Sequence, residues 1–159
     1  VIEPGINHDA RFVLGPADLT SSDLLGAWAE PEGSGFGAVI GFTAGGTVRL
    51  AETMSARYSS FQGAPSGFGA DEAIDVNGEV ASFARITSPS AGGCIIIVGS
   101  RGRGLSGNDA SNLVAELQGA AHLVSQPQQP ECSGNKPTFV LDGKNSGGRS
   151  LIVQGETLR

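Results

Sequence analysis

Histidine is the usual base for a serine, threonine or cysteine nucleophile, and this chain has two histidines, His8 and His122. His8 stands next to Asp9 near the N-terminus, a position typical of a solvated residue. His122 falls late in a predicted helix, where an imidazole can hydrogen-bond the free carbonyls of the last turn. The sequence also contains no Gly-x-Ser-x-Gly elbow and no Walker phosphate loop. We therefore predict no catalytic residue.

Paired carboxylates can hydrolyse glycosides when the fold brings them to facing positions. The candidates lie in segments rich in glycine and proline: Glu30, Glu32, Asp71, Glu72 and Asp75. The last three of these, and separately Asp142 with Asn145, also offer oxygen ligands for calcium, but neither group has the spacing of a known calcium loop. Ordinary turn chemistry accounts for these residues better. We expect no bound metal and no cofactor.

The two cysteines, Cys94 and Cys132, have no histidine at the spacing that a tetrahedral zinc site needs. They instead predict a disulfide, which would close a loop of about 40 residues and stabilise the fold by about 4 kcal/mol. A disulfide persists in an oxidising compartment, so we expect an extracytoplasmic protein that is secreted, periplasmic or held at the cell surface. Two unpaired buried thiols in a cytosolic protein are the alternative.

Aromatic and arginine side chains occur in stretches that are rich in glycine and lack a regular apolar pattern. An exposed aromatic ring beside a rigid sheet can anchor a ligand or a partner, because it buries much apolar area at little entropic cost. In the alternative interpretation the rings fold back and cover one end of the fold. The candidate binding residues are Trp28, Tyr58, Phe61, Phe68, Arg101 and Arg103.

The composition sets the class of protein. A chain of 159 residues with 39% hydrophobic residues matches one domain, and its 25 glycines and 16% charged residues indicate a turn-rich fold. The net charge of -6 argues against nucleic acid, which needs clustered lysine and arginine, and the one dense basic patch is Arg101-Gly102-Arg103. No apolar run is long enough to predict a transmembrane segment. The sequence leaves open the oligomeric state and whether a leader or a lipid anchor was removed.

The predicted elements are mostly strands. Residues 1–18 are expected to form an irregular arm, and residues 19–159 a single β-rich domain. Hydroxyl side chains at residues 20–22 predict a short helix with Leu24, Leu25 and Trp28 on one face. Three hairpins are predicted: residues 38–43 with 47–51 across a Gly-Gly turn, 73–76 with 80–86 across Asn77-Gly78, and 138–141 with 150–153. Residues 59–69 are expected to form an exposed loop.

Two further segments have clear patterns. The run from Cys94 to Val98 is apolar throughout and β-branched after its cysteine, so it predicts a strand buried on both faces. Apolar residues recur every three or four positions from residue 108 to 125, behind the cap candidates Asn108 and Asp109, and predict one helix. The expected fold is a mainly β, antiparallel roll or barrel with one flanking α-helix and one disulfide.

Two segments resemble known families. Leu25-Gly26-Ala27-Trp28, followed by a strand and by Gly41-Phe42-Thr43-Ala44-Gly45-Gly46-Thr47-Val48, resembles the start of small bacterial lipocalin-like barrels and of META domains. A cysteine-containing strand, a helix and a closing hairpin also follow in the META order, here at Cys94, after Asn108 and at residues 151–153. The resemblance covers about residues 19 to 159. It implies a lipocalin-like or META-like barrel in a protein that is often exported or a lipoprotein.

These observations favour an exported, non-enzymatic binding or envelope-associated module that takes a small apolar ligand or a protein partner. Two alternatives remain open. The first is an inhibitor of a secreted protease, in which residues 1–11 would enter the protease cleft. The second is a hydrolase that uses loop carboxylates.

Overall fold

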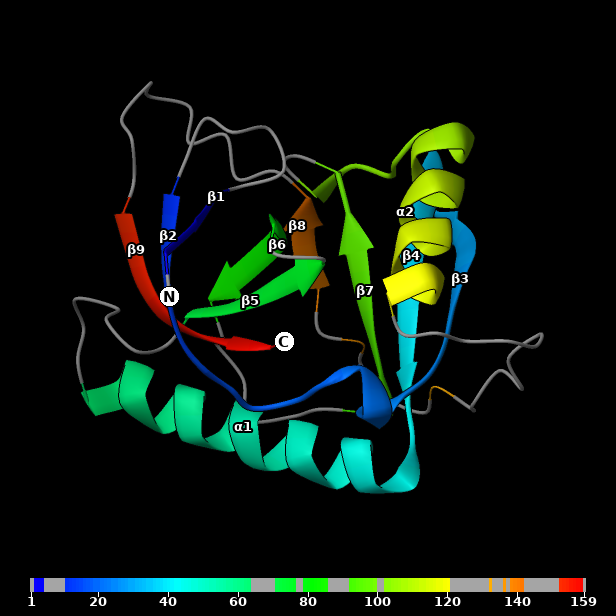
Figure 1. Ribbon diagram of the computed structural model, residues 1–159. Helices are drawn as coiled ribbons and strands as arrows, with labels where there is room; N and C mark the ends of the chain where they lie inside the picture. The colour runs from blue at the N-terminus through cyan, green and yellow to red at the C-terminus, as the bar shows by residue number, and fades with distance from the viewer. Residues whose placement is uncertain are drawn as a thin grey trace.

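The computed structural model describes residues 2–4, 11–63, 71–76, 79–85, 92–99, 102–120, 132, 136, 138–141 and 152–158. Its strands form one nine-stranded sheet in the order β1-β2-β9-β5-β6-β8-β7-β4-β3 (Figure 1). The strands are β1 (Ile2–Pro4), β2 (Arg11–Ala17), β3 (Leu24–Glu32), β4 (Gly35–Phe42), β5 (Asp71–Val76), β6 (Glu79–Arg85), β7 (Cys94–Val98), β8 (Thr138–Leu141) and β9 (Ile152–Leu158). The helices are the 3-10 turn η1 (Ser21–Asp23), α1 (Ala44–Gly63) and α2 (Gly107–Ala120).

The sheet is mixed, which corrects the predicted antiparallel architecture. Three strand pairs are parallel: β2 with β9, β5 with β9, and β7 with β8. Over the described strands β1 and β3 end the sheet and do not pair with each other, so the predicted barrel is not confirmed. The predicted β-rich fold is present, but the parallel pairs distinguish it from an antiparallel roll.

The strand β7 is buried on both faces, as predicted, and lies between two apolar clusters. Ile95 and Ile97 belong to the larger cluster, which includes the buried face of α2. Cys94, Ile96 and Val98 face the other side of the sheet and belong to a smaller cluster. Alternation along a strand explains this division, because successive side chains point to opposite faces.

The helix α2 covers one face of β3 and β4, and α1 lies below the sheet in Figure 1. The predicted helix at residues 108–125 is confirmed as far as Ala120, the last described residue of the segment. It begins one residue earlier than expected. Its cap is Ser106, whose Oγ accepts the N–H of Asp109 at 3.1 Å, rather than Asn108 or Asp109.

The helix α1 contradicts the hairpin predicted at residues 38–51. β4 is a strand, but the chain turns into a helix at Ala44, so the predicted strand 47–51 and the predicted loop at 59–63 are both helical. Thr43 caps this helix, since its Oγ1 accepts the N–H of Gly46 at 3.0 Å. A side chain at Gly46 would place its Cβ 2.5 Å from the Asp23 carbonyl oxygen, so this glycine permits close packing against η1 and makes no turn.

Three further predictions about single segments or strand pairs differ from the structure. The helix expected after residue 20 is the single turn η1, and Leu24 and Trp28 lie on β3. Within the irregular arm expected at 1–18, residues 2–4 and 11–17 form strands. The strands β8 and β9 do not form the expected hairpin, because β8 lies between β6 and β7 whereas β9 pairs with β2 and β5. The hairpin of β5 and β6 is confirmed.

Candidate binding site at the Phe36–Arg103 end

The structure separates the predicted binding residues. Trp28, on β3, is half-buried against the smaller apolar cluster, which contains Val39 and Ile96. Tyr58, on α1, packs against the larger cluster on the other side of the sheet. The Phe61 side chain, Phe68 and Arg101 lie outside the described residues. The two described rings therefore do not share a site.

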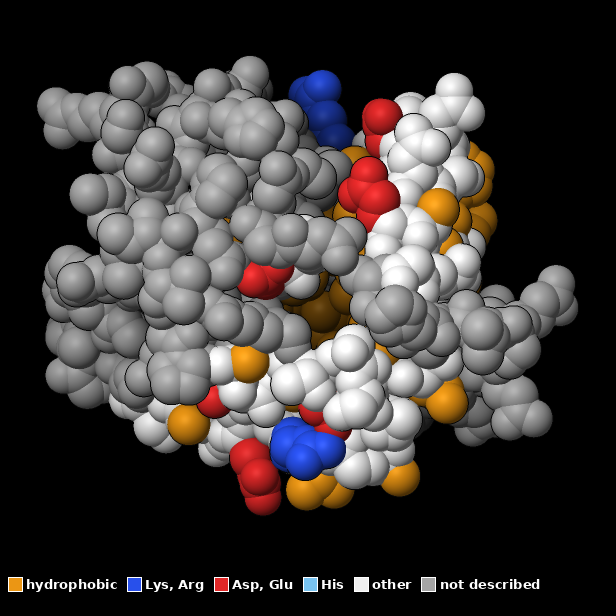
Figure 2. All heavy atoms as spheres, viewed as in Figure 1, with side chains coloured by type: hydrophobic (Ala, Val, Ile, Leu, Met, Phe, Trp, Pro, Cys, Tyr) orange, Lys and Arg blue, Asp and Glu red, His pale blue; other side chains and the backbone are white. Residues whose placement is uncertain are grey.

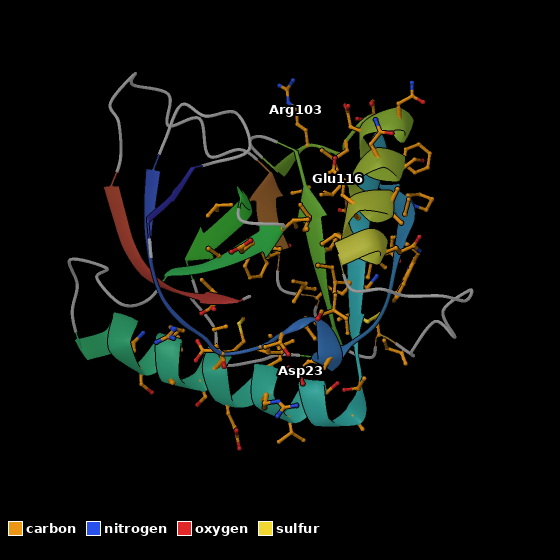
Figure 3. All side chains as sticks on the ribbon, in the orientation of Figure 1. Asp23, Arg103 and Glu116 are labelled. Carbon is orange, nitrogen blue, oxygen red and sulfur yellow. A yellow bond between two sulfur atoms is a disulfide. The ribbon has the colours of Figure 1, made fainter. Side chains whose placement is uncertain are left out.

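Arg103 is exposed at the end of the sheet where the chain leaves β7. It projects beyond the ribbon in Figure 3, and Figure 2 shows basic atoms standing out from the surface at the same edge. Its backbone belongs to a tight turn, in which the N–H of Gly99 donates to the Arg103 carbonyl at 2.7 Å and the N–H of Gly102 donates to the Gly99 carbonyl at 3.1 Å. Gly102 has φ +71°, a left-handed conformation that favours glycine.

This turn is fixed to the start of β4 and the end of β3 by backbone contacts. The N–H of Phe36 donates to the Leu105 carbonyl at 2.9 Å, and the N–H of Leu105 donates back to the Phe36 carbonyl at 2.6 Å. A Cβ on Gly104 would lie 2.5 Å from the Glu32 carbonyl oxygen and 2.6 Å from the Cα of Gly35. The two segments therefore touch through their main chains, and a side chain at Gly104 would force them apart.

Phe36 is a large apolar side chain exposed at the same end of the sheet as Arg103. It is 39% exposed, although its strand neighbours from Gly37 to Phe42 are buried. Its ring lies over the first residue of α2, since a Cβ on Gly107 would be 3.5 Å from the Phe36 Cε2. Below the surface, Leu105 is buried in the larger apolar cluster and anchors the turn. We call the residues 32–36 and 102–107 the Phe36–Arg103 end.

Sequence reasoning selected Arg103 but missed Phe36. The signal for Phe36 is its position directly after Gly33-Ser34-Gly35, which forms the loop of the β3–β4 hairpin, with Gly33 at φ +57°. The long-range contact with residues 104–105 has no signal in the local sequence.

The disulfide lies on the face of the sheet that is opposite the larger apolar cluster. Cys94 and Cys132 are bonded as predicted, with their Cα atoms 5.4 Å apart. Cys132 and Trp28 both pack against the cluster around Val39. Lys136 forms an ion pair with Glu30 of β3, which joins the segment before β8 to the edge strand. This face is occupied by structural contacts.

Two arginines of α1 form ion pairs with segments distant in sequence. Arg57 donates from Nε to Glu72 Oε2 at 3.0 Å and from Nη2 to Asp18 Oδ2 at 2.5 Å. Burial alone would lower the pKa of Arg57, but the two carboxylates outweigh burial and raise it. Arg49 pairs with the buried Asp23, at the opposite end of the molecule from Arg103 in Figure 3. The carboxylate of Glu72, one of the candidates for acid–base chemistry, is therefore engaged in holding α1 to β5.

Within the part of the chain that the structure describes, no three His, Cys, Asp or Glu side chains gather where they could hold a metal ion. Over the same part, no helix combines the length and the apolar character needed to cross a membrane. Comparison with protein-family models, with characterised proteins and with solved structures gives no match. The likeness to META domains and lipocalin-like barrels thus remains a prediction.

Proposed function

We propose that this chain is an extracytoplasmic, non-enzymatic module that binds a protein partner through the Phe36–Arg103 end. The observation that carries the proposal is an exposed phenylalanine at the start of β4 and an exposed arginine in the turn after β7, two segments joined by reciprocal backbone hydrogen bonds between Phe36 and Leu105. Aromatic residues and arginine are the side chains most often found at the centre of protein interfaces.

The rigidity of the two segments supports this proposal. Ordering a flexible loop on binding costs free energy, so a surface that is already fixed binds more tightly for the same contacts. Here Leu105 is anchored in the core, and its reciprocal hydrogen bonds with Phe36 hold the backbone of the turn that carries Arg103 against the start of β4. A partner would need an apolar side chain for the ring and a carboxylate for the guanidinium, which forms short charge-assisted hydrogen bonds.

The disulfide supports the extracytoplasmic part of the proposal. The Cys94–Cys132 bond closes a long segment and is compatible with an oxidising compartment, in which such bonds persist. Neither a small apolar ligand nor protease inhibition is favoured by a specific contact among the described residues.

Site-specific photocrosslinking in the producing cells tests the proposal. A photoreactive phenylalanine analogue replaces Phe36, and in a matched control it replaces Val48, an apolar residue on α1 that is 59% exposed. We expect one discrete cross-linked protein from position 36, none from position 48, and at least a tenfold loss of the product when Arg103→Glu is added. Equal cross-linking at both positions, or no effect of the charge reversal, would contradict the proposal.

A further inference from the structure

The direction of the backbone groups on the edge strand β3 follows from its neighbours. The N–H of Phe42 on β4 donates to the Gly93 carbonyl at 2.9 Å, on the β7 side of the strand. In an antiparallel ladder, alternate residues direct both backbone groups to the same side. The even-numbered residues of β4 therefore face β7, and the odd-numbered residues face β3.

The strand register then assigns the outer edge. Val39 and Gly37, which face β3, lie opposite Trp28 and Glu30. The alternate residues of β3 face away from the sheet: Ala27 and Ala29 with both their N–H and C=O groups, and Pro31 with its C=O group. Ala29 and Pro31 are exposed. Such an edge can add another strand unless something blocks it.

Two of the outward groups are blocked. The Ala27 carbonyl accepts a hydrogen bond from Nε2 of Gln118, on α2, at 2.8 Å. Pro31 has no N–H to donate, and an edge strand is where proline is tolerated in a sheet. The register also shifts between Leu24 and Gly26, which leaves Leu25 as an irregular position at the start of the edge.

Together, the Gln118 hydrogen bond and Pro31 prevent the β3 edge from pairing with the β3 edge of a second copy of this chain. Two β3 edges related by a twofold axis at Ala29 would pair antiparallel, with Ala27 of one copy opposite Pro31 of the other. The hydrogen bond lost at that pair is the one from residue 31 to the Ala27 carbonyl. Proline removes its donor, and the Gln118 amide occupies its place at the acceptor.

We infer that Gln118 and Pro31 close the β3 edge to self-pairing and keep this chain from dimerising through β3. Gln118 acts by occupying an acceptor that faces out of the sheet, and Pro31 by withholding a donor. This role is separate from the Phe36–Arg103 end, because it concerns the backbone of β3 and the last turn of α2.

The test uses the full chain with the double substitution Gln118→Ala and Pro31→Thr, studied by sedimentation equilibrium over a range of concentrations. Restoring a donor and an acceptor at two symmetric positions should strengthen self-association by about 25-fold, at about fivefold for each of two hydrogen bonds. Glu116→Ala, at an exposed position of α2, is the control and should leave self-association unchanged.

Adding Ala29→Pro to the double variant separates strand pairing from general destabilisation. The Ala29 N–H faces outward, so proline removes no hydrogen bond within the sheet but blocks the centre of the symmetric pairing. We expect this triple variant to return to the self-association of the parent. The inference is overturned if the double variant associates no more than the parent, if Ala29→Pro fails to reverse its association, or if the parent already dimerises with a protected Ala29 amide.

Discussion

Arg57 on α1 donates to Glu72 on β5 across 3.0 Å, and Glu72 is fully buried. The same guanidinium binds Asp18, just after β2. One side chain thus joins a helix, a strand at the middle of the sheet and the segment that leads into η1. Its removal should affect three parts of the fold at once.

Replacing one partner of this pair should be far more harmful than replacing both. Arg57→Met leaves a buried carboxylate without its countercharge and should lower the free energy of unfolding by about 3–5 kcal/mol. Arg57→Met with Glu72→Leu removes both charges and should recover at least half of that loss. Urea denaturation measures both variants. A double variant as unstable as the sum of the single variants would show that the charges do not act as a pair.

The contribution of Arg57 should not vary with pH in the neutral range. A raised pKa means that the folded state holds the proton more tightly than the unfolded state. The resulting stability is fully present below the pKa of the unfolded chain and is lost only as pH rises through the folded value, far above the neutral range. The difference in unfolding free energy between the parent and the double variant Arg57→Met with Glu72→Leu, which leaves no buried carboxylate unpaired at this site, should therefore be flat from about pH 6 to about pH 9. A slope would assign the effect to another titrating group.

Adjacent glycines in α1 should respond in opposite ways to alanine. A Cβ on Gly45 would meet only Arg49 Nη2, at 4.0 Å, which is an ordinary contact, so Gly45→Ala should stabilise the protein by about 0.5–1 kcal/mol through helix propensity. Gly46→Ala places a methyl carbon 2.5 Å from the Asp23 carbonyl and should destabilise it by about 1–3 kcal/mol. Thermal denaturation of the two variants is a matched comparison. A stabilised Gly46→Ala variant would rule out close packing as the reason for that glycine.

The disulfide should be complete in protein isolated from its own host. Denatured, unreduced protein should take up no alkylating reagent by intact mass, and prior reduction should allow two additions. Replacing both cysteines with alanine should cost about 2–5 kcal/mol of unfolding free energy. Uptake of reagent on both cysteines without reduction would remove the main support for an extracytoplasmic location.

The parts of the fold that could be predicted have local signals. The apolar run of β7, the Asn77-Gly78 turn between β5 and β6, and the helical spacing in α2 each identify their element without reference to the rest of the chain. The disulfide could be predicted because the chain has two cysteines and no nearby metal ligands. In each of these elements the local preference and the tertiary environment agree.

The predictions that failed concern segments whose structure is determined by tertiary contacts. Gly45-Gly46 has the composition of a hairpin turn, but the close approach of Asp23 and the Thr43 cap make it the first turn of a helix. β8 pairs in parallel with β7, and β9 pairs in parallel with β5. Each pair joins segments that are distant in sequence, so no local turn signal predicts the pairing. For the same reason the contact of Phe36 with Leu105 could not be predicted, although the exposure of Arg103 follows from its glycine-rich surroundings.

The reciprocal hydrogen bonds between Phe36 and Leu105 also determine how the protein would respond to mechanical force. A partner pulling on Arg103 would load β7 along its length, against the antiparallel neighbour β4. The bonds between these strands lie across the direction of pull, so they would be sheared together rather than unzipped one at a time. At the far end of β7 the load passes into the covalent Cys94–Cys132 bond. The Phe36–Arg103 end thus lies near one end of a strand that is covalently tethered at the other.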